Sequence, residues 1–572
     1  MFRKTDTNEQ LDIFTSPSSV MGKRAVKKYT DPSSWHNQFF DLVTSRIDEG
    51  TFSVLFPDGK KQGRPNASIR VLVAMSVLKE GYGCSDEDLF DRCEFDLLVR
   101  KALGLECLDD ELPSLDTWYL FRRRICQYDA ENGTDLMQQC FEQVTGSQVK
   151  QLNISGRSVR MDSKLIGSNI AKQTRYTLIH KTMVLFLKNN ALTRLPKRMI
   201  ARAEEYMGED SQKTVYRSAG DTLTVRMTQM GQFICSLLKR YEPTASHYAL
   251  LKRLFDEQFN VVDGNANLKD KNDIPGNSLQ SPYDEDATYR NKGDQKVSGM
   301  VTNITETVEP DKPSIIVSVQ VETATTADCH MFQEGIENAE RVTDDTVENS
   351  YADGAYQSPE NREFAKGHND MKLKTCKMQG KRSRWDLTLR DDGNLDVVDM
   401  ATGETFIAIR AVSKKSDKVR WRIPWEQSKT GWRYFEHKEL KAAELRRQTE
   451  SLPPEEQHKR NNVEAAMFQY SFHTRNGKTR YRGLAKHRMH AYSRCLWMNM
   501  RRIMIFQSKT FQRAISAAKS AFSAILEATR EAWNGFGEIR EILSRIPFSA
   551  MNHPDWRLKA IRITISSKNA TF

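Results

Sequence analysis

Hydrophobic residues recur with helical spacing through residues 35–150. In "ASIRVLVAMSVLKEGYG" the apolar positions lie mostly on one helical stripe, namely Ile69, Val71, Leu72, Met75 and Leu78. We expect this helix to end at Gly81 or Gly83 and the next one to begin with Ser85 as its N-cap. A further helix is expected in "PSLDTWYLFRRRI", after a short acidic link. Short helices separated by tight breaks predict a helical N-terminal domain with a helix-turn-helix arrangement.

Residues 151–378 change to strands that later alternate with helices. Strand-like alternation is found in "SVRMDSKLIGSN", "KVSGMVTNITETV", "PSIIVSVQVETAT" and "NSYADGAY". A basic helical insert at about 172–260 follows the first strand, and "EPDKP" is expected to join the second and third as a hairpin. Helices are expected in "MFQEGIENAERV" and from "SPENREFA" onward. This order predicts an α/β domain with a mixed sheet and flanking helices.

The remaining segments differ from both of these regions. Residues 379–454 alternate apolar and polar positions around "DDGN" and "ATGE" turns, which predicts a small β-rich insertion. Helical periodicity returns from about Asn461, so residues 455–510 are expected to complete the α/β domain and residues 511–572 to form a helical C-terminal tail. Residues 1–34 are polar and are expected to be a tail with little structure of its own.

Composition and charge narrow the class of protein. The 572 residues are 38% hydrophobic and carry a formal net charge of +11, which favours a polyanionic partner. Nine cysteines form no CxxC pair, so we expect reduced thiols and neither a disulfide framework nor a zinc site. We see no signal peptide and no apolar run of membrane-spanning length. These features predict a cytoplasmic protein with no membrane partner.

Three acidic residues fit one chemistry: Asp162 on the first strand of the mixed sheet, Asp353 near the end of a later strand, and Glu464 in the first turn of a helix after the β-rich insertion. Carboxylates are hard oxygen ligands for Mg²⁺, and phosphodiester cleavage needs divalent ions to activate the attacking oxygen and stabilise the leaving one. An isolated aspartate at a strand end is more often a solvated turn residue. By spacing alone, Asp286 and Asp328 fit equally well.

Several longer segments resemble the DDE transposases of bacterial insertion sequences, and most closely the group named after insertion sequence eleven-eighty-two. The matching segments occur in the family's order between about residues 35 and 505: "GRPNASIRVLVAMSVLKEGYGCSDEDLFDRCEFDLLVRKALGL", "PSLDTWYLFRRRI", "VRMDSKLIGSNIA", "YDEDATYRNKG", "YADGAYQSPEN" and "RYRGLAKHRMHAY". The resemblance implies an all-α DNA-binding domain followed by an RNase H-like catalytic domain with an insertion before its third acid. Other members can carry cysteines in that insertion, whereas this chain has none between Cys376 and Cys495.

The resemblance assigns the three acids to one site. It makes Asp162, Asp353 and Glu464 the catalytic residues and the ligands of Mg²⁺, with Mn²⁺ as an alternative ion. The family pattern is incomplete around Glu464, because Gln457 and Ser471 stand where relatives often have Tyr and Lys. Arg460 does match its Arg position. If that register is wrong, Glu455 and Glu456 are the alternatives, although Pro453 and Pro454 beside them predict a loop.

Basic residues predict a path for double-stranded DNA. Residues 465–526 contain twelve Lys or Arg and no Asp or Glu, with Tyr481, Tyr492 and Trp497 among them. "FRRRI" lies in the position of a helix-turn-helix reader, although its arginines would also suit the solvent face of an amphipathic helix. The residues predicted to contact DNA are Arg122, Arg123, Arg124, Arg460, Arg475, Lys478, Arg480, Arg482 and Lys486.

Together these features predict a transposase that binds the terminal inverted repeats of an insertion sequence and cleaves and joins DNA strands. Pairing two element ends implies a homodimer on DNA and a place at the bacterial nucleoid. Two other functions stay open. A decayed transposase would bind DNA without catalysis, and a nuclease would cut without joining.

Overall fold

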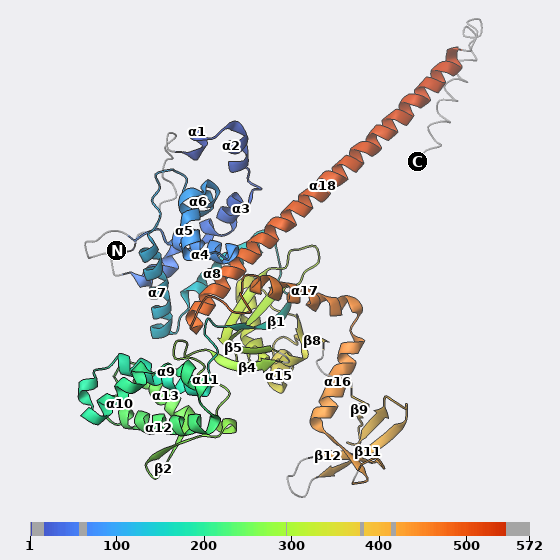
Figure 1. The fold of residues 1–572 in the computed structure, drawn as a ribbon. Helices are drawn as coiled ribbons and strands as arrows, with labels where there is room; N and C mark the ends of the chain where they lie inside the picture. Colours follow the sequence, from blue (N-terminus) through green and yellow to red (C-terminus); the bar gives the residue numbers. More distant parts are fainter. Residues whose placement is uncertain are drawn as a thin grey trace. The chain divides into compact units, whose positions relative to one another are not determined.

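The computed structural model describes residues 2, 16–56, 66–292, 295–377, 383–412, 419–428 and 430–544. The chain divides into two compact units, residues 1–504 and residues 505–572. The long helix α18 (Leu484–Ser544) begins in the first unit and continues into the second. Figure 1 shows the elements under the labels used below. Among the helices that the structure describes, none has the length and apolar character that crossing a membrane requires.

The N-terminal region is helical, as predicted. Its elements are α1 (Pro17–Val20), α2 (Lys23–Tyr29), α3 (Trp35–Leu42), the 3₁₀ turns η1 (Thr44–Arg46) and η2 (Glu49–Leu55), α4 (Ile69–Tyr82), α5 (Asp86–Phe95), α6 (Leu97–Leu103), α7 (Leu115–Asn132) and α8 (Leu136–Leu152). The caps follow from the sequence. Ser85 and Asp88 form a capping box on α5, and Gly83 ends α4 with φ +64°. The prediction of an unstructured tail was wrong for residues 17–29, which form α1 and α2.

The central sheet is mixed, as predicted. It contains β1 (Ser158–Gly167), β4 (Thr288–Lys292), β5 (Gln295–Thr307), β6 (Ile316–Thr323), β7 (Asn349–Asp353) and β8 (Lys372–Lys377). β1 pairs antiparallel with β5 and parallel with β7, β7 pairs parallel with β8, and β5 also pairs antiparallel with β4 and β6. Antiparallel pairings thus join four strands, β1, β4, β5 and β6, and the parallel strand β7 comes after the crossover helix α14 (Phe332–Thr343).

Helices cover both faces of this sheet. α14 packs on β5 and β6, next to the 3₁₀ turns η5 (Asp328–Met331) and η6 (Gly354–Tyr356), and α15 (Pro359–Gly367) packs on β8. On the opposite face, α17 (Pro454–Ser471) packs along β1. One hydrophobic cluster contains buried residues of the N-terminal helices, the sheet, α17 and the start of α18. The N-terminal helices and the sheet therefore share a single core.

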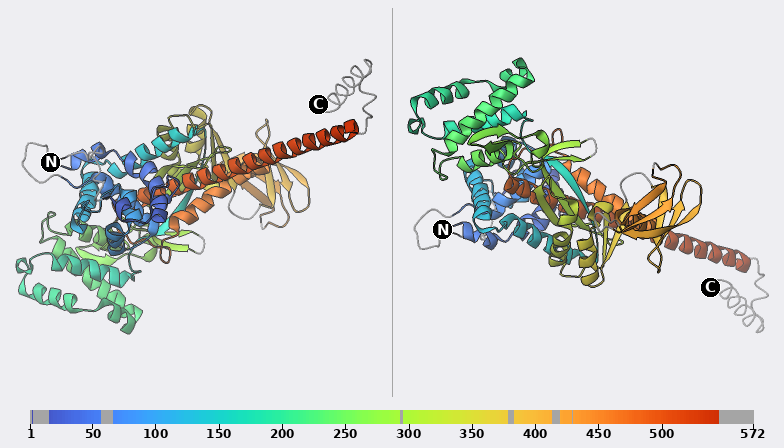
Figure 2. Two further views of the ribbon diagram at one scale, coloured as in Figure 1. Left: turned by 90° about the horizontal axis from the view of Figure 1, so that it is seen from above. Right: turned by 90° about the horizontal axis from the view of Figure 1, so that it is seen from below.

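Two insertions have cores of their own. The first contains α9 (Arg175–Lys188), η3 (Leu192–Arg194), α10 (Lys197–Gly208), α11 (Ser211–Arg217), α12 (Gly220–Leu238), α13 (Tyr248–Gln258) and the hairpin of β2 (Phe259–Val262) and β3 (Asn265–Leu268), before η4 (Lys271–Asp273). These helices are the green cluster of Figure 2. The second is an antiparallel half-barrel of β9 (Trp385–Leu389), β10 (Leu395–Asp399), β11 (Thr405–Val412), β12 (Val419–Pro424) and β13 (Trp432–Glu436), packed against α16 (His437–Ser451).

Candidate active site

Asp162 and Asp353 come two residues after the last paired positions of two neighbouring parallel strands, β1 and β7. The recorded register pairs Ser158 with Asn349 and Arg160 with Tyr351, and two residues further along each strand come Asp162 and Asp353. Paired strands in a sheet are about 4.8 Å apart, so the two aspartates follow directly on backbone segments that lie next to each other. The sequence could not give this pairing, because the strands are separated by almost two hundred residues that include the helical insert.

Both carboxylates are on the face of the sheet that α17 covers. Arg160 and Lys164 reach α17, since Arg160 Nη1 donates to the Lys459 carbonyl at 2.7 Å and Lys164 Nζ donates to Ser471 Oγ at 2.7 Å. Asp162 lies between them in the strand, and alternate residues of a strand point to the same face. On β7 the Tyr351 hydroxyl accepts from Lys459 Nζ at 3.2 Å, and Asp353 follows it by two residues.

Glu464 is on the stretch of α17 that runs past Asp162. The helix contacts β1 at Lys459, beside Arg160, and again at Ser471, beside Lys164. Glu464 falls between these contacts, and Ser471 is seven residues later on the same helical face. Glu464 is exposed, whereas Asp353 is 5% exposed. The three predicted acids therefore come from three separate elements, β1, β7 and α17, of which β1 and β7 are adjacent inner strands of the sheet.

The helical position predicted for Glu464 was wrong. α17 begins at Pro454 and not near Asn461, so Glu464 is in its third turn. Proline is well suited to the first turn of a helix because it has no N–H to leave unpaired there. The prediction of a loop at Glu455 and Glu456 was wrong for the same reason, since both are in the first turn. Glu456 forms an ion pair with Lys374, with 2.6 Å between Oε2 and Nζ.

The surroundings of the two aspartates are polar and ordered. Asp162 Oδ1 accepts from the Ser163 N–H at 2.9 Å, and Asp353 Oδ1 accepts from the Ala355 N–H at 2.9 Å. Tyr356 is buried and donates to Asn303 Oδ1 at 2.7 Å. Its burial, followed by the negative charge of Asp162, raises the pKa of Tyr356 well above its ordinary value, so the hydroxyl keeps its proton. Tyr356 therefore adds no negative charge beside the carboxylates.

The donor set suits a hard divalent cation, because all three predicted ligands are carboxylates. The three do not all lie within 4.8 Å of one another; among the residues that the structure describes, the only such group is Cys107, Asp109 and Asp110. Three ligands that share one ion need that closeness, whereas ligands divided between two ions about 3.5–4 Å apart do not. As placed, the three carboxylates therefore do not form a site for a single ion.

The two competing aspartates have structural partners. Asp328 is 3% exposed and forms ion pairs with Arg290 at 3.1 Å and Lys292 at 3.3 Å. Asp286 accepts from the Leu484 N–H at 2.8 Å, which satisfies the first backbone donor of α18. Neither aspartate is part of the parallel pairing of β1 and β7. These contacts give Asp286 and Asp328 structural roles, which makes them weaker candidates for the site than spacing alone indicated.

Several of the residues predicted to bind DNA donate hydrogen bonds to backbone carbonyls of distant parts of the chain. Arg480 donates to the carbonyls of Gly83 and Cys84, at the C-terminal end of α4. Arg482 Nε donates to the Asn169 carbonyl at 2.7 Å, and Lys478 Nζ donates to the Ile170 carbonyl at 2.7 Å. Arg475 is exposed in the turn before Lys478, and the side chain of Arg460 lies outside the described structure.

The arginines of α7 face this basic segment. Arg122 stacks over Trp118 with its guanidinium carbon 4.5 Å from the ring centroid, and it is 5.4 Å from that of Tyr481. Arg123 is exposed, and Arg124 is 5.5 Å from the ring centroid of Phe56. A cavity of about 810 Å³ is lined by five cations and one carboxylate among other residues: Lys79, Arg122, Arg123, Arg480, Lys486 and Asp86. Four residues of the two separately predicted basic patches thus line one cavity, namely Arg122, Arg123, Arg480 and Lys486.

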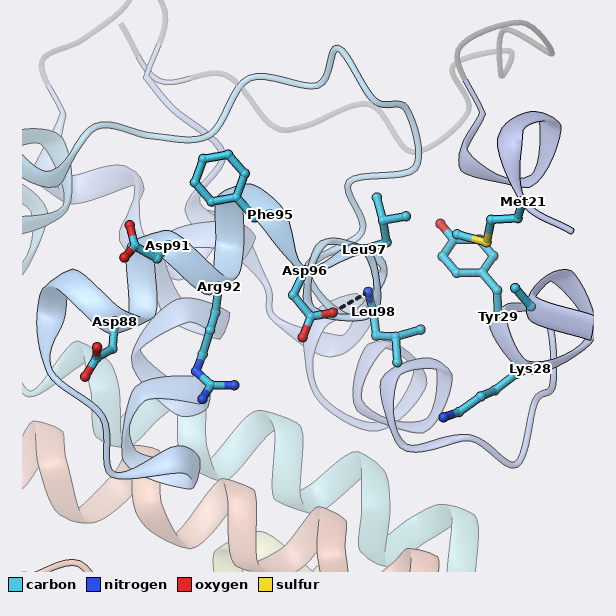
Figure 3. Close-up of a pocket in the computed structure, with 11 residues that line it drawn as sticks. Met21, Lys28, Tyr29, Asp88, Asp91, Arg92, Phe95, Asp96, Leu97 and Leu98 are labelled. Atoms are coloured by element: carbon cyan, nitrogen blue, oxygen red, sulfur yellow. Dashed lines mark hydrogen bonds between the residues drawn. The ribbon is translucent and has the colours of Figure 1, made fainter.

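Sequence reasoning missed a second cavity, of about 830 Å³, in the N-terminal region. Figure 3 shows that it is lined by residues of α2, α5 and α6, including the apolar Leu97, Leu98 and Phe95. Asp96 caps α6 by accepting from the Leu98 N–H at 2.9 Å. It was missed because residues 17–29 were assigned to an unstructured tail. None of the predicted site residues lines it.

Glu80 connects α4 to the basic segment and α18. Its carboxylate accepts from the Tyr481 hydroxyl and lies 2.6 Å from His490 Nδ1. Burial alone would raise the pKa of Glu80, but the charges and hydrogen bonds of His490, Lys79 and Tyr481 outweigh it and lower that pKa to about 2. A carboxylate with a depressed pKa stabilises the folded state above its unfolded pKa and loses that effect as the pH falls toward the folded value.

We therefore expect Glu80→Gln to destabilise the protein in a pH-dependent way. The free energy of unfolding should fall by roughly 3 kcal/mol at pH 6, and the difference from wild type should shrink by about 2 kcal/mol at pH 3. Urea unfolding at both pH values measures this, with exposed Glu94 on α5 changed to Gln as the control. A deficit that is the same at both pH values would contradict the charge argument.

Comparison with known proteins shows a similarity in the N-terminal region. Residues 28–124 match the family model described as "Transposase domain (DUF772)". The match runs from the end of α2 into α7 and includes Arg122, Arg123 and Arg124. Comparison with curated proteins and with solved structures gave no significant match. Over this region the chain is similar to the transposase domain family, in agreement with the predicted class.

Proposed function

We propose that this protein is an insertion-sequence transposase that cleaves and joins DNA strands at Asp162, Asp353 and Glu464. The observation that supports the proposal is the parallel register of β1 and β7, which pairs Arg160 with Tyr351 two residues before Asp162 and Asp353, while Glu464 is on the helix α17 that packs along β1. The match of residues 28–124 to a transposase domain supports the same function from a separate part of the chain. The sheet order β6-β5-β1-β7-β8 also agrees with the RNase H-like domain that the sequence resemblance implies.

The three carboxylates would hold Mg²⁺, or Mn²⁺ in its place. When bound, these ions supply activation of the attacking oxygen and stabilisation of the leaving oxygen. The chain would hold the carboxylates in fixed positions. β1 and β7 fix the two aspartates, and Arg160 and Lys164 fasten α17 over them. Tyr356 stays protonated, so the negative charge of the site comes from the carboxylates.

DNA would lie along the positive cavity between α7 and the segment before α18. Five cations against one carboxylate favour phosphate groups, and Arg122 is held in place by its stacking on Trp118. Backbone carbonyls already accept hydrogen bonds from the side chains of Arg480, Arg482 and Lys478. The main effect of these residues on DNA would therefore be through their charge. Exposed Arg123 and Lys486 are the best placed to contact phosphate directly.

Charge reversal in this cavity should weaken DNA binding. We expect Arg123→Glu with Lys486→Glu to reduce affinity for a duplex at least tenfold and to lower the slope of log affinity against log salt by about 1 or 2, since each phosphate contact contributes about 0.9. Fluorescence anisotropy over a salt series, with EDTA present, measures both quantities. Lys438→Glu on α16, whose side chain is 79% exposed, is the matched control. Binding by the double variant equal to that of the control would rule out this path.

A strand-transfer assay tests the proposed function. Duplexes from the DNA flanking the gene would be supplied as uncut ends and as ends with a free 3′-hydroxyl, together with a target plasmid and Mg²⁺. A transposase cuts the first and joins the second. Cleavage without joined product would indicate a nuclease, and binding without either reaction would indicate a remnant that has lost catalysis.

A further inference from the structure

The second unit of the chain exposes an apolar seam along α18. Large apolar side chains stand at Phe511, Ile515, Phe522 and Ile525, and their exposed fractions are 67%, 39%, 63% and 60%. With Ala518 they follow the spacing 4, 3, 4, 3, which places all five on one side of the helix. We define these five residues as the α18 seam. Exposed apolar side chains in this number and order need a partner surface.

The spacing identifies what kind of surface this is. Assigning Ser508 as position a of a heptad places Ile515 and Phe522 at a, and Phe511, Ala518 and Ile525 at d. The same register continues in the sequence through Thr529, Ala532 and Phe536, with the polar residues Ser508 and Thr529 at two of its a positions. A repeat of seven residues keeps the seam facing a second helix as the two wind around each other, whereas a helix packed on a globular core needs no strict repeat.

The residues beside the seam favour a second copy of this chain. Positions e and g usually select the partner through their charges, and from Gln507 to Ala521 only Lys519 is charged there, the others being Gln507, Gln512, Ala514 and Ala521. Two identical seams would therefore meet with little like-charge repulsion. The remaining cations, Lys509 and Arg513, are at positions b and f on the outer side.

We propose that the α18 seam joins two copies of this protein as a coiled coil in the absence of DNA. Such an interface between identical surfaces is closed and two-fold, so it produces a dimer and not a filament. The inference depends only on residues of the second unit and stands apart from the proposed catalytic function. It differs from pairing by DNA ends, because it requires no DNA.

Light scattering after size-exclusion chromatography tests this on the full chain without DNA. The wild type should have twice the 65.8 kDa chain mass at micromolar concentration. Phe522→Lys with Ile525→Lys places two ammonium groups in the seam and should raise the dimer dissociation constant at least about a hundredfold, giving the monomer mass. Ser520→Lys with Ser523→Lys adds the same charge at the same spacing on the outer positions f and b, and should leave the dimer intact.

Circular dichroism checks that the variants keep their helices. A wild-type chain of monomer mass at tens of micromolar would overturn the proposal, and would indicate that another part of the chain covers the seam. A seam variant as dimeric as the Ser520 and Ser523 control would overturn it as well. Loss of the dimer only when the seam is changed supports it, whether or not the protein cleaves DNA.

Discussion

Changing Asp162 to asparagine should lower the rate of DNA strand cleavage by about a thousandfold or more, because metal-assisted stabilisation of a transition state is worth several kcal/mol and each 1.36 kcal/mol is about tenfold. The asparagine keeps the shape of the side chain and can still accept from the Ser163 N–H, so the fold should persist. The expected loss is therefore in catalysis and not in stability.

The measurement is single-turnover cleavage of a labelled end duplex in Mg²⁺. Glu363→Gln, an exposed residue of α15, is the control that removes one acid from the same domain and should cleave like wild type. Anisotropy should give the same DNA affinity for all three proteins within about twofold. Cleavage by Asp162→Asn at the rate of the control would mean that Asp162 is not a catalytic residue.

The largest effect on stability is expected at Glu306, which is completely buried between two arginines. Its carboxylate accepts from Arg160 Nε at 2.5 Å and from Arg502 Nη1 at 2.6 Å, and Arg160 is itself 4% exposed. Glu306→Ala would leave these two cations facing each other without their shared counter-charge. Breaking a buried pair from one side costs about 3–5 kcal/mol, so we expect unfolding free energy to fall by that amount.

Chemical denaturation of the wild type and Glu306→Ala measures this loss. The double variant Arg160→Met with Glu306→Met should recover part of it, because both buried charges of the closest pair are then gone. A loss below about 1 kcal/mol for Glu306→Ala would mean that the pair is effectively solvated. Arg160 also holds α17 through the Lys459 carbonyl, so Glu306→Ala should slow cleavage more than Glu363→Gln does.

Local signals in the sequence predicted the elements well. β1 alternates apolar and polar residues around Asp162, and α4 and α5 end and begin at Gly83 and Ser85, where a left-handed glycine and a capping serine act over a few residues. The start of α17 was misjudged because Pro453 and Pro454 suggest a loop, although proline is also suited to a first helical turn.

Long-range contacts could not be predicted in this way. The parallel pairing of β1, which holds Asp162, with β7, which holds Asp353, spans the whole helical insert. The basic residues near Arg480 were interpreted only as a DNA path, whereas Arg480 also fastens the segment to the end of α4, almost four hundred residues earlier. Charge runs in a sequence do not distinguish these two uses, because both require exposed or half-buried cations.

The most direct test of the central claim is a change of metal preference at Asp162. A thiolate ligand binds softer ions better than Mg²⁺, so Asp162→Cys should cleave DNA very slowly in Mg²⁺ and recover at least about tenfold when Mn²⁺ replaces it. The wild type, measured in both metals, gives the preference of the carboxylate. Recovery specific to the cysteine variant is the result that metal binding by Asp162 predicts. If the ratio of the cleavage rate in Mn²⁺ to that in Mg²⁺ were the same for Asp162→Cys as for the wild type, metal binding by Asp162 would be contradicted.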